Sequence, residues 1–263
     1  MSEAPDAAPG RGLGPVDPSA GERKRFERWA AQGGRIGAPQ EAVPAATVIL
    51  LRDGCDGLET LMLRRASKLS FAGGLWVFPG GRVDDADRAG PDPDPDDALG
   101  AARRAAVREA AEEADLAVAV DALVPLAHWE PPPQTPKRFA TWFFLAAAPE
   151  GAVTVDGGEI TEHEWARPAT VLERRDAGEI ELAPPTWVTL HTLAGHADVA
   201  AALAAARRST IEFFTTRAAR TDDGGVVAMW HGDAGYESGE AGAPGARHRL
   251  WMVDTGWRYE RTV

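Results

Sequence analysis

The chain has 263 residues, of which 44% are hydrophobic, and its formal net charge is −12. This length and apolar content allow one domain with a sizeable core and a small appendage. The negative charge disfavours a general nucleic-acid binder, because phosphate backbones are bound by basic side chains. A single cysteine, Cys55, excludes an internal disulfide and a cysteine zinc cluster. With no long apolar run and no leader-like start, the sequence predicts a cytoplasmic protein without a membrane segment.

The first 40 residues are expected to form a flexible segment that precedes the folded domain. Residues 1–20 are rich in Pro, Gly and Ala and have little apolar surface to bury. Residues 21–32 (GERKRFERWAAQ) predict a short helix that docks through Phe26 and Trp29. The main domain is expected to span residues 41–208.

The domain begins with β-rich apolar runs. Residues 45–51 (AATVILL) predict a buried strand, and residues 59–65 (ETLMLRR) a second one that completes a hairpin. Residues 76–83 (WVFPGGRV) predict a strand that ends in a sharp turn at Pro79, Gly80 and Gly81. Two glycines let a backbone carbonyl approach an ion or a phosphate without a side chain in the way.

A helix carrying three carboxylates follows at residues 101–116 (AARRAAVREAAEEADL). Glu109, Glu112 and Glu113 stand at i, i+3 and i+4, so they share one face of this helix. Like charges held that close repel, and a bound divalent cation removes the repulsion, because hard ions prefer carboxylate oxygens. For these three residues alone, a solvated acidic face is the alternative interpretation.

Together, the glycines and the helix resemble the Nudix hydrolase superfamily. Gly81 fits the first glycine of the Nudix box, and residues 108–116 fit its second half, with the Arg-Glu and Glu-Glu pairs in order. The sequence departs from the box at Asp87, where the box has Glu, and at Asp115, where it has Gly. Between Asp87 and Arg108 stand 20 residues instead of seven. Asp115 is expected in a left-handed conformation just past the helix, and Asp96 or Asp97 to cap its start.

Two further segments resemble the coenzyme A diphosphatase branch of this superfamily. They are residues 61–81, with LMLRRA, Gly74 and FPGG at matching spacing, and residues 138–146 (RFATWFFLA). An insertion inside the box also resembles this branch. Leu63 and Ser70 depart from the branch motif, which has Thr and Arg at these positions.

The resemblance implies an α/β/α sandwich, a Nudix fold in which a mixed β-sheet is flanked by helices. The Glu-bearing helix would cover one face, and helices within residues 168–208 the other. The implied reaction is divalent-metal-dependent hydrolysis of a diphosphate linkage in a nucleoside diphosphate derivative. The first candidate substrate is coenzyme A or an acyl-coenzyme A. Alternatives are ADP-ribose, NADH or nucleotide sugars, and a non-catalytic Nudix-like ligand-binding module.

The resemblance also assigns roles to particular residues. The ligands of Mg²⁺ or Mn²⁺ would be the carboxylates of Glu109, Glu112 and Glu113 and the carbonyl of Gly80. Glu112 and Glu113 would also be catalytic, and Arg108, which can pair with Glu112 at i+4, would orient them. The residues expected to contact the substrate are Arg64, Arg65, Gly81 and Arg138.

A further carboxylate from outside the box is expected in residues 157–168, which read as a loop and a strand. Of Glu159, Glu162 and Glu164, we favour Glu162 as catalytic, because Glu164 adjoins the apolar strand residue Trp165.

The remaining elements can be predicted from their apolar patterns. The expected strands are residues 116–120, 123–128 and 138–147, and the expected helices are residues 168–176 and 198–208. A β-rich extension, residues 209–263, is expected to pack on the same domain. It reads as β-segments at residues 211–218, 225–231 and 247–260, with a Gly-rich loop at residues 232–246. These segments either extend the sheet or form the surface of a homodimer. His231 and Asp233 lie at a strand end, where either a structural or a functional role is open.

Overall fold

The fold was analysed in a computed structural model, which describes residues 41–68, 72–89, 97–133, 135, 138–221, 225–253 and 256–263. The helix expected at residues 21–32 lies outside the described residues. So do Ser70 and residues 90–96, including Asp96.

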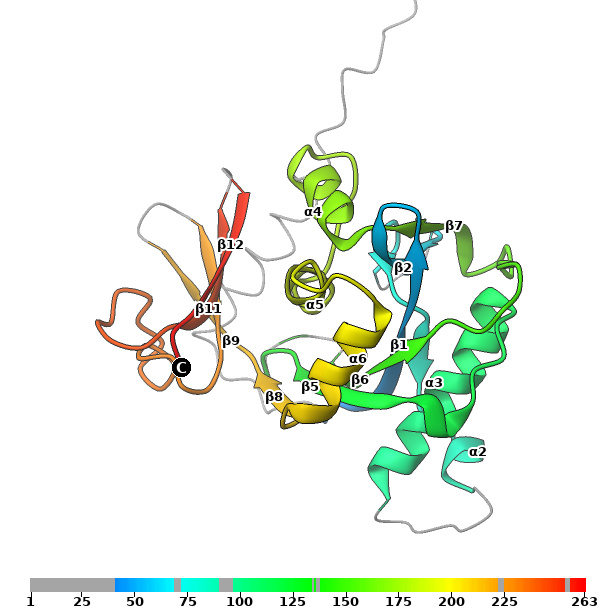
Figure 1. Ribbon diagram of the computed structural model, residues 1–263. Helices are drawn as coiled ribbons and strands as arrows, with labels where there is room; N and C mark the ends of the chain where they lie inside the picture. Colours follow the sequence, from blue (N-terminus) through cyan, green and yellow to red (C-terminus); the bar gives the residue numbers. More distant parts are fainter. Residues whose placement is uncertain are drawn as a thin grey trace, which may run out of the picture.

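A mixed β-sheet of eight strands forms the centre of the described molecule (Figure 1). Its order is β3-β2-β1-β6-β5-β8, and β4 and β7 pair additionally with β1 and β2. The β1–β6 and β5–β8 pairs are parallel and the others antiparallel. The strands are β1 (Val43–Gly54), β2 (Gly57–Arg65), β3 (Trp76–Val77), β4 (Gly80–Arg82), β5 (Val124–Glu130), β6 (Phe139–Ala147), β7 (Ile160–Ala166) and β8 (Glu212–Thr215).

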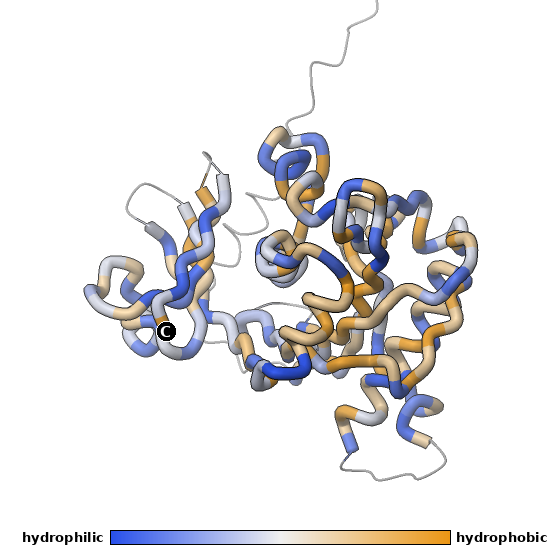
Figure 2. The backbone as a smooth tube through the Cα atoms, in the orientation of Figure 1, coloured by the Kyte–Doolittle hydropathy of each residue, from blue (hydrophilic) through white to orange (hydrophobic). Residues whose placement is uncertain are grey.

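Helices cover both faces of this sheet, because β1 is apolar on both sides. Val48 and Leu50 pack under α3 (Ala98–Ala114), whereas Ile49 and Leu51 face the opposite core. Three helices line that second core, namely α4 (Pro168–Asp176), α5 (Pro184–Leu193) and α6 (Val199–Arg208). Apolar residues are accordingly concentrated between sheet and helices (Figure 2). The predicted α/β/α sandwich is confirmed.

Caps define the ends of α3, the helix with the carboxylates. The Asp97 side chain accepts a hydrogen bond of 2.7 Å from the Gly100 N–H at its start. Asp115 ends the helix in the left-handed region, with φ of 56°, and its N–H bonds back to the last turn. Both predicted caps are confirmed. The four-residue helix α2 (Asp85–Arg88) precedes α3 in the chain and packs against it.

The C-terminal residues form a second, antiparallel sheet with the order β12-β11-β10-β9. Trp230 and Trp257 of this region belong to the same buried cluster as Trp187 of α5, and Trp129 of β5 meets Trp230 edge-on at 5.5 Å. One continuous core therefore joins the second sheet to the sandwich. Its strands are β9 (Arg217–Arg220), β10 (Val226–Met229), β11 (His248–Val253) and β12 (Gly256–Arg261).

Several boundary predictions were wrong. Residues 116–119 form no strand, and Val120–Ala122 is a short 3₁₀-helix. Leu116 and Val118 are buried as strand residues would be, but they sit beneath the end of α3, and the Leu116 N–H bonds to the Ala110 carbonyl. The apolar pattern of residues 116–120 therefore indicated that they are buried, but it did not indicate whether they pair with another strand.

The remaining differences concern where strands begin and end. The segment 211–218 splits into β8 of the first sheet and β9 of the second, and the segment 247–260 is the β11–β12 hairpin. Gly80 and Gly81 lie inside a strand, β4, and not in a turn. Among the described helices, none is long and apolar enough to cross a membrane.

Candidate active site

At the two glycines of β4, neighbouring atoms lie closer to the backbone than any side chain would allow. A Cβ added to Gly80 would lie 2.5 Å from the Ala46 carbonyl oxygen of β1. A Cβ added to Gly81 would lie 2.2 Å from Oε1 of Glu109. Both distances are shorter than real Cβ contacts. The first glycine is therefore needed for the sheet, and the second leaves room for a carboxylate of α3.

Glu113 is the most buried carboxylate of the helix, with 6% of its surface exposed. The Gly80 N–H donates to its Oε2 at 2.9 Å, and Nη1 of Arg65 lies 3.6 Å from its Oε1. Burial raises the pKa of Glu113 to about 8, although the Gly80 N–H and the Arg65 charge act in the opposite direction. The negative charge of Glu109 adds to the increase.

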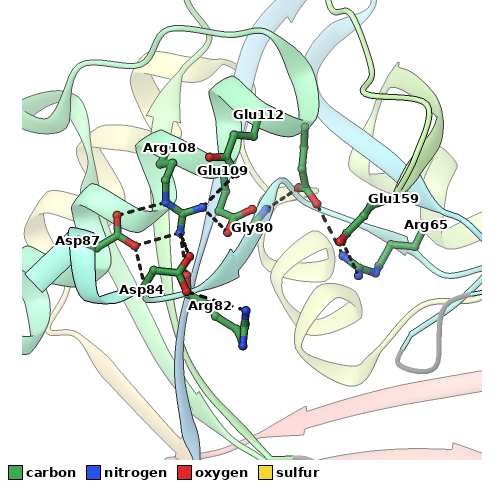
Figure 3. A network of polar contacts seen from close by, with 10 residues as sticks. Arg65, Gly80, Arg82, Asp84, Asp87, Arg108, Glu109, Glu112 and Glu159 are labelled. Carbon is green, nitrogen blue, oxygen red and sulfur yellow. Dashed lines mark hydrogen bonds and ion pairs between the residues drawn. The ribbon is translucent and has the colours of Figure 1, made fainter.

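Arg108 links the other two glutamates of the helix (Figure 3). Its Nη1 donates to Oε1 of Glu109 at 2.8 Å and to Oε2 of Glu112 at 3.1 Å. Burial raises the pKa of Glu109, and the contact with Arg108 partly offsets this. The other side of the guanidinium contacts the Arg82 carbonyl at 2.9 Å and the carboxylate of Asp87. Arg108 is thus the centre of a network that joins α3 to β4 and α2.

Asp87 is a site residue whose role the sequence did not reveal. It is 5% exposed, and its Oδ2 accepts from the Asp84 N–H and from Nη2 of Arg108, both at 2.9 Å. The bond to Asp87 is the main reason why the pKa of Arg108 lies above its ordinary value. In the sequence, Asp87 appeared only as a departure from the box. Its position as the sixth residue after Gly81 was the available signal.

The two predicted arginines of β2 have different surroundings. Arg65 lies at the carboxylates, between Glu113 and Glu159, whose Oε2 is 3.3 Å from its Nη2. Arg64 instead pairs with Glu162, its cross-strand partner on β7, at 2.6 Å. Glu164 is bound to Arg174 of α4. The structure therefore brings Glu159 to the site, and it does not bring Glu162 or Arg64 to Glu113.

Arg138 is also placed away from the carboxylates. Its side chain is 9% exposed at the start of β6, where Nη2 lies 3.4 Å from the Pro131 carbonyl and 3.7 Å from Glu130. The predicted contact between Arg138 and substrate phosphate stays a prediction.

Asp233, for which both roles were open, has a structural one. Its carboxylate forms a fully buried ion pair with Arg249 and accepts the His248 N–H at 2.9 Å. Hydrogen bonds with Arg249 lower the pKa of Asp233 against the effect of its burial. The pair fastens the loop after β10 onto β11.

The donor set of α3 fits a hard divalent cation. Three carboxylates share one helix face, and two of them, Glu109 and Glu113, have raised pKa values because they are buried. A buried anion costs free energy that a bound cation offsets. As arranged, no three acidic, His or Cys side chains among the described residues are grouped closely enough to hold a metal ion. Arg108 and the Gly80 N–H satisfy the carboxylate oxygens instead.

Comparison with solved structures found several that are similar to this chain. A crystal structure of a NUDIX hydrolase from Alicyclobacillus acidocaldarius has a TM-score of 0.56 and 26% identity, and covers 66% of this chain and 99% of that chain. A MutT NUDIX hydrolase from Burkholderia pseudomallei has a TM-score of 0.42 and 20% identity, with 58% and 98% covered. The NUDIX domain of Shewanella oneidensis NrtR, in complex with ADP ribose, has a TM-score of 0.43 and 16% identity, with 62% and 94% covered. A search of the curated proteins gave no match.

The sequence model of the NUDIX domain matches residues 42–186, which is 145 of the 263 residues. This segment contains the glycines of β4, the carboxylates of α3 and their arginine partners. The chain therefore belongs to the NUDIX domain family, the Nudix hydrolases that act on nucleoside diphosphate derivatives, and is a pyrophosphohydrolase.

Proposed function

We propose that the protein hydrolyses the diphosphate linkage of its substrate with Mg²⁺ or Mn²⁺ held by Glu109, Glu112 and Glu113. The observation that carries this proposal is the burial of Glu113 and Glu109 against the two glycines of β4, which raises the pKa of both carboxyls. Such an arrangement is costly for a purely structural cluster, because Arg65 and Arg108 do not fully offset the effect of burial on the two carboxylates. The Gly80 carbonyl remains a proposed further ligand.

When bound there, a divalent ion supplies a water of lowered pKa and neutralises charge at phosphorus. The residues of this chain contribute position and charge. Gly81 has no side chain, and the space beside its backbone is filled by the carboxylate of Glu109. Arg108 holds Glu109 and Glu112 in place on α3. Arg65, at the edge of the carboxylates, can contact the anionic substrate through its guanidinium.

The carboxylate from outside the box is best assigned to Glu159. It shares Arg65 with Glu113 and is 62% exposed, so it can reach a water molecule at the site. Glu162 is engaged by Arg64 and has no contact with this group. The geometry therefore favours Glu159 over the residue that the sequence favoured.

For the substrate, we propose coenzyme A or an acyl-coenzyme A. The support is the resemblance of residues 61–81 and 138–146 to coenzyme A diphosphatases. ADP-ribose, NADH or a nucleotide sugar is the second candidate, favoured by one observation. Arg64 and Arg138 were expected to contact the substrate phosphates, but Arg64 is paired with Glu162, and Arg138 lies near Glu130 and the Pro131 carbonyl. This arrangement offers less charge to the additional 3′-phosphate of coenzyme A.

A substrate panel tests both the metal-dependent hydrolysis and the choice of coenzyme A as substrate. The kcat/KM values for coenzyme A, acyl-coenzyme A, ADP-ribose, NADH, diadenosine polyphosphates and nucleoside triphosphates are compared with Mg²⁺, with Mn²⁺ and in EDTA. We expect turnover only with metal and the highest kcat/KM with the coenzyme A compounds. A tenfold lead for ADP-ribose or NADH would refute the coenzyme A assignment alone. Turnover in EDTA would refute the metal-dependent mechanism.

A further inference from the structure

The peptide group between Pro79 and Gly80 makes a direct contact with the carboxylate site. Its N–H belongs to Gly80 and donates to Oε2 of Glu113 at 2.9 Å, beside the other carboxylates of α3 (Figure 3). Its carbonyl belongs to Pro79 and accepts from the Val48 N–H at 2.9 Å and from the Thr47 hydroxyl at 2.6 Å. One planar unit therefore joins β1 to the most buried carboxylate of the helix.

This peptide group has to be held in place, because a glycine follows it. The strand pairing requires Gly80, since a Cβ there would lie 2.5 Å from the Ala46 carbonyl oxygen. Glycine adopts positive and negative φ about equally readily, so the peptide group before it rotates more easily than one before another residue. Rotation would turn the N–H away from Glu113 and leave a buried carboxylate without this donor. The hydrogen bonds on the carbonyl side oppose this rotation.

The Thr47 hydroxyl supplies one of these hydrogen bonds from the other face of the sheet. Ala46 and Val48 face α3, and side chains alternate along a strand, so Thr47 lies on the opposite face. Thr47 is 7% exposed, and its hydroxyl must be the donor because a carbonyl only accepts. One hydrogen bond from Val48 alone would let the peptide group pivot, whereas two donors hold its plane. Two bonds on the carbonyl also polarise the amide and strengthen its N–H as a donor.

Thr60 of β2 provides a comparison within the same sheet. It is fully buried, but among the described residues its hydroxyl has no hydrogen-bond partner. Thr60 pairs with Leu51, four positions along β1 from Thr47, which is roughly 13 Å. A change from threonine to valine removes the same hydroxyl at either position. In the part of the chain that the structure describes, only the change at Thr47 breaks a hydrogen bond.

We propose that Thr47 is a positioning residue of the metal site. Its hydroxyl fixes the Pro79–Gly80 peptide group so that the N–H holds Oε2 of Glu113. The carboxylate is thereby kept in one orientation on the face of α3 that would hold the cation. This inference rests on the proposed function in one respect, namely that Glu113 is a metal ligand. The hydrogen bonds exist without metal, so the two statements can be tested separately.

The first measurement follows the Gly80 N–H by NMR of the ¹⁵N-labelled full chain in EDTA. In Thr47→Val, which keeps the shape of the side chain, the Gly80 proton resonance should move upfield and its exchange with solvent should become faster. The reason is that its hydrogen bond to Glu113 weakens. Thr47→Ser retains the hydroxyl and should stay close to wild type in both properties. Thr60→Val is the matched control and should leave both unchanged.

The second measurement is calorimetric titration of the same variants with Mn²⁺. Replacing a residue that orients a metal ligand typically lowers metal affinity about 10–100-fold, and we expect a loss of this size in Thr47→Val. Thr47→Ser and Thr60→Val should bind Mn²⁺ as wild type does. Thermal melts in EDTA establish that each variant is folded. Thr47→Ala removes the same hydroxyl and adds no atom, so it keeps the test decisive if Thr47→Val does not fold.

An unchanged Gly80 resonance in folded Thr47→Val would overturn the positioning role. So would wild-type Mn²⁺ affinity together with a lower Tm, because a purely structural hydrogen bond gives that result. Equal Mn²⁺ affinity of wild type and Glu113→Gln would instead refute Glu113 as a metal ligand and with it the proposed function. The Gly80 resonance in EDTA would then still decide whether Thr47 holds the N–H on Glu113.

Discussion

Asp87 of α2 and Arg108 of α3 form an ion pair through two hydrogen bonds. Nη2 of Arg108 lies 2.9 Å from Oδ2 of Asp87, and Nε lies 3.3 Å from Oδ1. Although 21 positions separate them, the pair fixes α2 against the middle of α3. The pair thus holds the segment before residue 90 against the helix that carries the carboxylates.

Replacing Asp87 by Asn should therefore reduce both stability and activity. The change leaves the guanidinium of Arg108 with a weaker partner, and a hydrogen bond to a charged group is worth about 1.5–3 kcal/mol. We expect a loss of this size in urea unfolding and a lower kcat, because Arg108 also holds Glu109 and Glu112. Asp85→Asn, on the exposed side of α2, is the matched control and should behave as wild type. Equal stability of the two variants would contradict the assigned role.

The metal proposal predicts that Glu112→Gln and Glu113→Gln abolish turnover while the fold is retained. Each change removes one ligand charge but keeps the shape of the side chain. Losing an anionic metal ligand should cost about 3 kcal/mol or more of transition-state stabilisation, which is at least about a hundredfold in kcat. Steady-state kinetics and circular dichroism are the measurements. The control is Glu150→Gln in an exposed loop, and near wild-type turnover in both site variants would refute the assignment.

Gly80 and Gly81 should respond differently to alanine. In Gly80→Ala the new methyl meets backbone atoms of Ala46 and Thr47 that cannot move without opening the sheet, so we expect a loss of about 1–3 kcal/mol in stability. In Gly81→Ala the atoms nearest to the methyl are those of the Glu109 carboxylate, whose side chain can rotate away. Stability should then change little, whereas kcat should fall at least tenfold because a ligand is displaced.

Urea unfolding and kinetics of both variants test this contrast. Gly242→Ala is the control, because its added Cβ would meet no atom within 4 Å. A Gly81→Ala variant with full activity would show that the position of Glu109 is not critical.

The glycines also show what could be predicted from the sequence. Residue spacing located Gly81, Glu109 and Glu113 and the helix caps, because each depends on local geometry. The strand inside which Gly80 lies could not be predicted, because it exists only through pairing with β1. The partners of Arg64 and Arg65 were hidden for the same reason, since the register between β2 and β7, with its irregularity at these two residues, is set by tertiary packing.

The pKa of Glu113 predicts how stability depends on pH without metal. Its value of about 8 in the folded protein lies above the ordinary value of 4.5, so the folded state holds this proton more tightly than the unfolded state. The stabilisation from this proton is present in full below about pH 4.5, and it is lost as the pH rises through about 8. The glutamine in Glu113→Gln cannot titrate. The contributions of all other titratable groups to the pH dependence of stability are the same in both proteins, so they cancel when the variant is compared with wild type.

In EDTA, the Tm of Glu113→Gln should be close to that of wild type at pH 5 and higher at pH 9. A difference of 1 in pKa corresponds to about 1.4 kcal/mol, so the two proteins should differ in stability at pH 9 by on the order of 1 kcal/mol or more. Melting curves at both pH values provide the measurement. A difference in Tm that does not change with pH would mean that Glu113 is ionised in the folded protein throughout this range.

The assignment of Glu159 predicts an asymmetry between two neighbouring glutamates of the same segment. Glu159 is joined to Glu113 through Arg65, so Glu159→Gln should lower kcat at least tenfold and alter the pH profile of kcat, with little change in KM. Glu162→Gln removes only an exposed ion pair with Arg64, which contributes about 0–1 kcal/mol to stability, and its kcat should match wild type. The two variants make the same substitution three positions apart, with Glu159 just before β7 and Glu162 within it, so their comparison isolates the contact with the site. If Glu162→Gln lost activity and Glu159→Gln did not, the residue favoured by the sequence would be the catalytic one, and β7 would have to present it to Glu113 when substrate is bound.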